Sequence, residues 1–202
     1  MGRQTWLECG FSSWIFRIMH TPQHMIQQIM MRDPAQAPAT SAKRPVSSQA
    51  LHEELSYHIA WLRVLEIWFH HAHWSTKGNT YYGDHLLFER IYNEVSELID
   101  PVAEKAVGMC GESVADTHMC SKLVAEMLCA YPSPSRANEA TMIAATGLAL
   151  VKDYLETLSE TYKKLKETGD LTLGLDDMLM SHANKLEEFE YLLKQRVQKT
   201  IG

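Results

Sequence analysis

The stretch HHAHWSTKGNTYYGDHLLFERIYNEVSELIDPVAEKAVGMCG, residues 70–111, decides the fold. Its apolar residues recur at three- and four-residue intervals between Leu86 and Val102, a period that predicts one long helix over about residues 80–108. A Lys-Gly-Asn turn at residues 77–79 separates this helix from the apolar run before it. The stretch therefore predicts a helical hairpin.

Four side chains that can bind hard metal ions lie in this hairpin: His73, His85, Asp100 and Glu104. At a rise of about 1.5 Å per residue, His85 and Asp100 lie roughly 22 Å apart along one helix, so one metal ion cannot use both from one chain. Asp100 and Glu104 share a helix face, because residues four apart stack. An antiparallel second copy could bring its two histidines to these carboxylates. The spacing therefore predicts a metal site at a dimer interface.

The same stretch resembles the Dps mini-ferritins. The family pattern is His-Trp, a short loop with Gly, a second His, then Asp-x-x-Ala-Glu and a Gly near the helix end. The corresponding residues here are His73-Trp74, Lys77-Gly78, His85, Asp100-Pro101-Val102-Ala103-Glu104 and Gly108. The resemblance continues more loosely and covers roughly residues 47–199.

This resemblance implies a ferroxidase that oxidises Fe2+ to Fe3+, with hydrogen peroxide as the preferred oxidant. His73, His85, Asp100 and Glu104 would be both its metal ligands and its catalytic residues. It also implies a homo-oligomer, a hollow dodecamer built from two-fold dimers, which stores the iron as an oxyhydroxide mineral. Imidazole and carboxylate ligands suit iron, and carboxylates favour the harder Fe(III) product.

Less specific interpretations of these residues stay open. A lone histidine or carboxylate at a helix surface is usually a solvated side chain, and a purely structural bundle that has lost its metal chemistry would carry the same residues by coincidence. We expect His70 and His71 to be surface residues and Glu89 to be an ordinary exposed glutamate. Trp74 could donate electrons to an oxidant or pack at an interface.

Two further features bear on the metal site. Pro101 removes a backbone hydrogen bond in mid-helix and is expected to kink the helix, which could aim Asp100 better or spoil the site. The Glu-x-x-His pairs that build di-iron centres inside single bundles are absent, since Glu66 and His70 are four residues apart. An intrachain di-iron centre is therefore disfavoured.

DNA binding is the alternative function. The chain carries a net charge of −6, but five basic and two acidic side chains give residues 1–46 a charge of +3, which leaves −9 for the rest. A domain with this net negative charge is not expected to bind nucleic acid. DNA binding in the Dps family often rests on a lysine-rich tail, whereas here only Lys43 and Arg44 adjoin, with Lys194, Arg196 and Lys199 near the C-terminus. We expect weak or no DNA compaction.

The whole chain is predicted to be all-α, with an irregular or flexible N-terminal extension over residues 1–46 and a ferritin-like domain over residues 47–200. Three prolines among Ala, Ser and Thr in residues 33–48 are typical of a linker. Four long amphipathic helices and no strand pattern predict a four-helix bundle. A short extra helix over about residues 116–130 lies in the connection between helices two and three, and Pro132 and Pro134 end it.

Composition bounds the cellular setting. No run of eighteen apolar residues occurs, so no membrane span is expected, and residues 14–19 lack a convincing signal-peptide cleavage pattern. The four cysteines form no Cys-x-x-Cys pair and suggest no disulfide framework. A reducing cytoplasm is the expected location.

Overall fold

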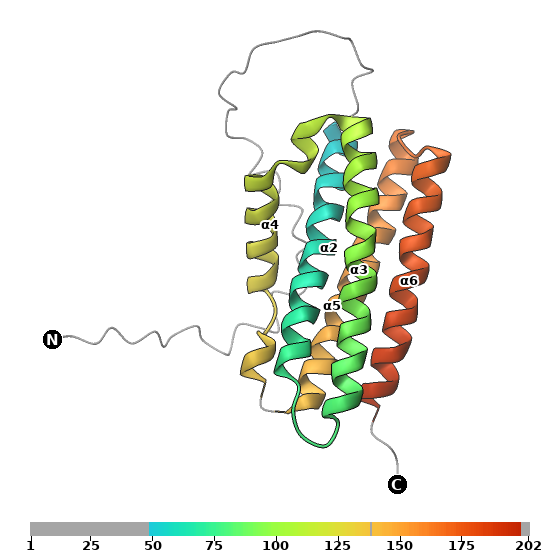
Figure 1. Cartoon of the computed structure of the whole chain (residues 1–202). Helices are drawn as coiled ribbons and strands as arrows, with labels where there is room; N and C mark the ends of the chain where they lie inside the picture. Colours follow the sequence, from blue (N-terminus) through green and yellow to red (C-terminus); the bar gives the residue numbers. More distant parts are fainter. Residues whose placement is uncertain (1–48, 138, 199–202) are drawn as a thin grey trace, which may run out of the picture. The chain divides into compact units, whose positions relative to one another are not determined.

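The computed structural model describes residues 49–137 and 139–198, and every regular element within these ranges is helical. The elements are α2 (Gln49–Ser75), α3 (Tyr81–Cys110), the 3-10 turn η1 (Glu112–Ala115), α4 (Thr117–Cys129), the 3-10 turn η2 (Pro134–Arg136), α5 (Ala140–Thr168) and α6 (Leu173–Val197). Figure 1 shows α2, α3, α5 and α6 as a bundle, with the shorter α4 alongside α2. The predicted four-helix bundle with an extra helix in its middle connection is confirmed, whereas the predicted extension over residues 1–46 lies outside the described residues.

The predicted hairpin of α2 and α3 is present. Gly78 has a positive φ of 81°, a conformation that side chains with a Cβ rarely adopt, and its carbonyl accepts the N–H of Tyr81 at 3.1 Å. The reversal therefore occurs at the Lys-Gly-Asn turn, and it lays α3 antiparallel along α2 (Figure 1).

Helix α3 continues through Pro101 without interruption (Figure 1). Proline cannot donate the bond that the carbonyl of Glu97 would normally accept. Both residues are exposed, so water can reach this region of the helix. Gly111 then ends the helix with a positive φ of 88°.

The second hairpin, α5 and α6, is closed by a different set of caps. Gly169 adopts the left-handed conformation at the end of α5, with a φ of 80°. The hydroxyl of Thr172 accepts the backbone N–H of Leu175 at 3.2 Å and so caps the start of α6.

Helix α2 occupies the centre of the packing, because α3, α4 and α5 all contact it. Its buried residues consequently lie on more than one face. Gly147 allows α5 to approach α2 closely, since a Cβ built there would lie 2.8 Å from the ring of Phe69. The largest fully buried side chains of the core include Tyr154, Phe69, Phe88 and Phe189.

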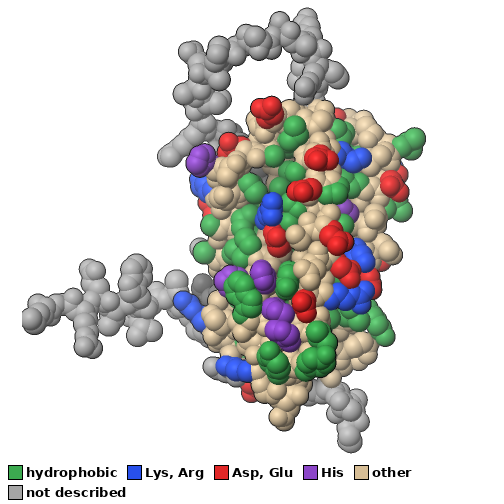
Figure 2. Space-filling view, viewed as in Figure 1, with side chains coloured by type: hydrophobic (Ala, Val, Ile, Leu, Met, Phe, Trp, Pro, Cys, Tyr) green, Lys and Arg blue, Asp and Glu red, His purple; other side chains and the backbone are tan. Residues whose placement is uncertain are grey.

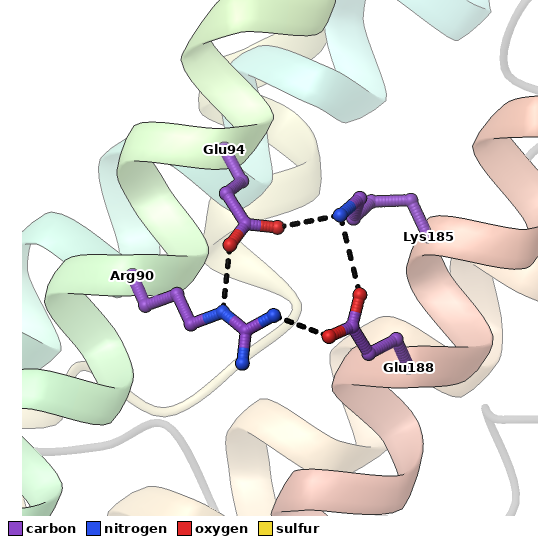
Figure 3. A network of polar contacts seen from close by, with 4 residues as sticks. All are labelled: Arg90, Glu94, Lys185 and Glu188. Atoms are coloured by element: carbon purple, nitrogen blue, oxygen red, sulfur yellow. Dashed lines mark hydrogen bonds and ion pairs between the residues drawn. The ribbon is translucent and has the colours of Figure 1, made fainter.

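Ion pairs between described residues join α3 to α6 at two places. Figure 3 shows Arg90 and Glu94 of α3 in a closed network with Lys185 and Glu188 of α6, including Lys185 to Glu94 at 2.8 Å. Near the end of α6, the guanidinium of Arg196 binds both carboxylate oxygens of Asp84, which is only 1% exposed. The second pair ties the end of α6 to the start of α3, because Arg196 also donates to the hydroxyl of Thr80, the residue that precedes α3, at 3.0 Å.

Candidate metal centre

His73 lies in the last turn of α2 and His85 in the second turn of α3, so the hairpin brings the two imidazoles together. Their ring centroids are 3.7 Å apart and the rings are nearly parallel, with an interplanar angle of 20°. Both side chains are half-buried. The twelve-residue spacing therefore corresponds to a local pair that the Lys-Gly-Asn turn creates.

Each histidine of this pair is oriented by the backbone of the other. Nδ1 of His73 donates to the carbonyl of His85 at 2.9 Å, and Nδ1 of His85 donates to the carbonyl of His73 at 3.1 Å. A carbonyl only accepts, so Nδ1 must carry the proton in both rings. In the neutral imidazole, Nε2 then keeps its lone pair, and neither Nε2 has a hydrogen-bond partner among the described residues. This arrangement fixes the tautomer that a metal ion requires.

Aromatic rings surround the pair. His70 stacks on Tyr92 with centroids 4.2 Å apart and contacts Trp74 at 4.3 Å, while Tyr81 stacks on His85 at 5.1 Å. His71 is exposed as predicted, whereas His70 is half-buried because these two rings cover it. Figure 2 shows histidine side chains gathered among hydrophobic ones on this face of the bundle.

Several large apolar side chains are exposed on the α2–α3 hairpin that carries the pair. They are Ile67 and Trp74 of α2 and Tyr81, Tyr82 and Leu86 of α3. Trp74 is 61% exposed and Tyr82 72% exposed. Contiguous exposed apolar residues on a soluble domain mark an interaction surface more often than isolated ones do. We call these five residues the apolar patch.

Asp100 and Glu104 lie one turn apart on α3, and both are exposed. Neither makes an ion pair or a side-chain hydrogen bond with a described residue, so both carboxylates remain available. The uninterrupted helix keeps Asp100 roughly 22 Å along its axis from His85. Among residues 49–137 and 139–198, no group of three or more His, Cys, Asp or Glu side chains could hold a metal ion. Within one chain the four predicted ligands thus fall into two separate pairs, His73 with His85 and Asp100 with Glu104.

Sequence patterns gave no sign of a second histidine pair, which lies in the core. Nε2 of His58 is 3.0 Å from Nδ1 of His182, and both residues are buried. Burial, with the neighbouring His182, lowers the pKa of His58 well below its ordinary value, and burial lowers the pKa of His182 to about 4. The two residues are 124 positions apart in sequence, so only the folded chain reveals the pair.

The basic residues near the C-terminus are largely neutralised within the chain. Lys194 pairs with Glu190 at 2.7 Å, and Arg196 is held by Asp84. Lys199 lies outside the described residues, as do Lys43 and Arg44. None of the helices in the described ranges combines the length and the apolar character that crossing a bilayer requires.

No family model matches the chain. Among curated proteins, it is 29% identical over 147 residues to DNA protection during starvation protein 2 of Bacillus anthracis, covering 68% of this chain and 94% of that one. It is 31% identical over 140 residues to antigen TpF1 of Treponema pallidum, covering 67% and 73% respectively. General stress protein 20U of Bacillus subtilis is 26% identical over 151 residues, covering 73% of this chain and 97% of that protein.

Solved structures share the fold. DpsC from Streptomyces coelicolor superposes with a TM-score of 0.67 at 23% identity, covering 83% of this chain and 98% of that one. Dps from Thermosynechococcus elongatus superposes with a TM-score of 0.65, also at 23% identity, covering 76% and 93%. These matches confirm the ferritin-like form of the four-helix bundle.

Proposed function

The chain belongs to the Dps family, and from this premise we propose that it is a mini-ferritin that oxidises Fe(II) with peroxide and stores the product, at sites shared by two subunits. The observation that carries the proposal is the reciprocal pair of His73 and His85. Both rings are held through Nδ1, both side chains are half-buried, and neither Nε2 has a hydrogen-bond partner among the described residues. A structural histidine pair has no need of this arrangement, whereas a metal ligand does.

The remaining ligands must come from a second copy of the chain. Asp100 and Glu104 are exposed and unpaired, but they lie too far along α3 to reach the histidines of their own subunit. The apolar patch beside the histidines supplies a surface that association would cover. An antiparallel two-fold dimer places each carboxylate pair opposite the partner's histidines, and two-fold symmetry then creates two equal sites.

The chemistry follows from the donor set. The neutral imidazoles of His73 and His85 bind Fe(II) through Nε2, and the carboxylates of Asp100 and Glu104 stabilise the harder Fe(III) product. Two Fe(II) ions supply the two electrons that reduce one molecule of hydrogen peroxide, with two protons, to two molecules of water. The reaction removes both reagents that would otherwise form hydroxyl radicals.

The assembly and setting that go with this function are those of the family: a homo-oligomer of two-fold dimers, twelve subunits in all, enclosing an iron mineral in the cytoplasm. DNA binding is expected to be weak, because Lys194 and Arg196 are already paired within the chain. Salt-dependent DNA affinity requires lysine and arginine side chains that are free to contact phosphate.

Peroxide-driven Fe(II) oxidation tests the proposal. The purified protein should consume Fe(II) and peroxide in a two-to-one ratio and retain the iron on sizing chromatography. The oxidation rate of the variant His85→Ala with Asp100→Ala should fall by more than about 100-fold. Losing one residue that only orients a metal ligand typically lowers metal affinity or activity by about 10- to 100-fold, and this variant loses two ligands. The matched control, His118→Ala with Glu156→Ala, changes one exposed histidine of α4 and one exposed glutamate of α5 and should keep the rate. Equal rates in both variants would show that His85 and Asp100 do not carry the oxidation and would contradict the proposal.

A further inference from the structure

The core of the bundle holds a polar chain that the metal centre does not use. The phenol oxygen of Tyr154 lies 2.6 Å from Nδ1 of His58, and Nε2 of His58 lies 3.0 Å from Nδ1 of His182. Tyr154 is fully buried, and His58 and His182 are 3% and 4% exposed. A buried phenol bonded to a buried imidazole is costly to assemble unless every partner is satisfied.

Counting donors and acceptors fixes the direction of this chain. The only hydrogen-bond partner of the Tyr154 hydroxyl among the described residues is His58, so the phenol donates to Nδ1. His58 then carries its proton on Nε2 and donates it to Nδ1 of His182. Burial keeps both imidazoles neutral, since it lowers their pKa values. A proton that leaves Tyr154 therefore has an acceptor already in place, and a second acceptor beyond it.

Trp61 packs against the other side of Tyr154. The two rings are stacked with centroids 5.2 Å apart and an interplanar angle of 13°. Trp61 also contacts Tyr131 edge to face at 6.5 Å. The indole N–H of Trp61 is buried, and a polar neighbour of it is the phenol of Tyr57, which is a much weaker base than imidazole. Trp61 can thus pass an electron but lacks an imidazole to take its proton, whereas Tyr154 has one.

A second tryptophan lies between this cluster and the surface histidines along α2. Trp68 is buried in α2, seven residues after Trp61 and five before His73. At about 1.5 Å per residue these intervals are about 10 Å and about 8 Å along the helix. Successive short electron transfers along α2 can therefore connect the surface of the hairpin with Tyr154.

We propose that Tyr154 is a redox-active tyrosine, which gives one electron through Trp61 to a one-electron oxidant while its proton passes to His58. The phenol O–H bond breaks, the proton forms an N–H bond at Nδ1 of His58, and the proton on Nε2 of His58 can move to Nδ1 of His182. The product is a neutral phenoxyl radical inside the bundle. One electron and one proton leave Tyr154, and the oxidant is reduced by one electron.

For its natural oxidant, this inference rests on the proposed function. Peroxide requires two electrons, and a site that holds a single Fe(II) supplies only one. Tyr154 supplies the second, so that peroxide, one Fe(II), the phenol and one further proton give two waters, Fe(III) and the phenoxyl radical. A later Fe(II) and a proton return the radical to tyrosine. The bundle interior thereby holds an oxidising equivalent that would otherwise leave as a hydroxyl radical.

Photochemical oxidation of the iron-free, full-length protein tests the relay without any ferroxidase activity. A flash-generated ruthenium(III) polypyridyl complex serves as the one-electron oxidant, and freeze-quenched electron paramagnetic resonance detects the radicals. Exposed tyrosines give short-lived signals, so the expected result is an additional long-lived tyrosyl signal. Tyr154→Phe should lose this signal, whereas Tyr191→Phe, which changes an exposed tyrosine outside the relay, should keep it. Trp61→Phe should slow its appearance.

Two further readouts guard against misfolded variants. Helical circular dichroism of each variant must match the unmodified protein. In the unmodified protein, electron–nuclear double resonance should detect one proton that forms a hydrogen bond to the phenoxyl oxygen. That proton is expected because Nδ1–H of His58 donates to this oxygen once the phenol has lost its proton. A long-lived signal that survives Tyr154→Phe, or one without that proton, would overturn the inference. Absence of iron oxidation in the separate peroxide assay would count against the proposed function and leave this result unchanged.

Discussion

Two histidine pairs in one chain have opposite hydrogen-bonding arrangements. At the hairpin, His73 and His85 are each bonded through Nδ1 to a backbone carbonyl, and neither Nε2 has a hydrogen-bond partner among the described residues. In the core, His58 uses Nδ1 with Tyr154 and Nε2 with His182, so neither nitrogen is left for a ligand. The partners of the ring nitrogens therefore separate a candidate metal ligand from an internal polar link, although all four residues are histidines on helices.

Truncation should affect the two pairs very differently. His58→Ala removes a buried ring and leaves Tyr154 and His182 without a partner, so it should lower the free energy of unfolding by about 3 kcal/mol or more. His73→Ala, at a half-buried position, should cost about 1 kcal/mol or less. Thermal unfolding at one fixed protein concentration measures both changes. Equal losses would mean that the surface pair is also structural.

Acidification should destabilise the fold through the core pair. An unfolded histidine titrates near pH 6.5, whereas folding lowers the pKa of His182 to about 4 and that of His58 well below 6.5, in both cases chiefly through burial. Above pH 6.5 neither state binds these protons and stability is unaffected. As the pH falls from 6.5 to 4, only the unfolded state binds them, so His182 alone should cost about 3 kcal/mol.

Comparing variants isolates this contribution. His182→Asn keeps an acceptor near the position of Nδ1 but cannot titrate, so its unfolding temperature should fall less between pH 6.5 and pH 4. His73→Asn should follow the unmodified protein over the same range, because His73 belongs to the surface pair. If the two variants showed the same pH dependence, the core pair would not be the source of acid sensitivity.

Binding of a redox-inert metal ion should distinguish the surface histidine pair from the core pair. Zn(II) at about 100 times its dissociation constant should stabilise the assembled protein by about 2.7 kcal/mol. Asp100→Ala with Glu104→Ala should lose this increase in unfolding temperature, and His182→Asn should keep it. The reverse pattern would assign the metal to the core.

The sequence predicts those parts of the fold that local chemistry determines. The turn before α3 and the end of α5 lie at Gly78 and Gly169, because both positions require a positive φ. The helices follow the period of their apolar residues, and the spacing of His73 and His85 is visible because a single turn joins them. Pro101 is compatible with a continuous α3, since the carbonyl of Glu97, which lacks its helical hydrogen bond, lies at an exposed position.

Contacts between distant segments could not be predicted in this way. His58 and His182 come from α2 and α6, and each alone resembles an ordinary position in an amphipathic helix. Glu54 of α2 is buried and bonded to Thr161 and Lys164 of α5, more than 100 residues away in the sequence. The four ligands of the proposed metal site are visible in the sequence, but how its two halves meet is not seen in one chain, because the proposal assigns them to two chains.

Complementation between two variants tests directly whether each metal site is shared by two chains. One variant carries His73→Ala and His85→Ala, and the other carries Asp100→Ala and Glu104→Ala, so neither alone should oxidise iron. A mixed dimer regains one intact site of its two, built from the histidines of one chain and the carboxylates of the other. Random co-assembly during co-expression should therefore restore about a quarter of the unmodified activity per subunit. Activity that remained at zero in assembled, folded mixtures would contradict the shared site.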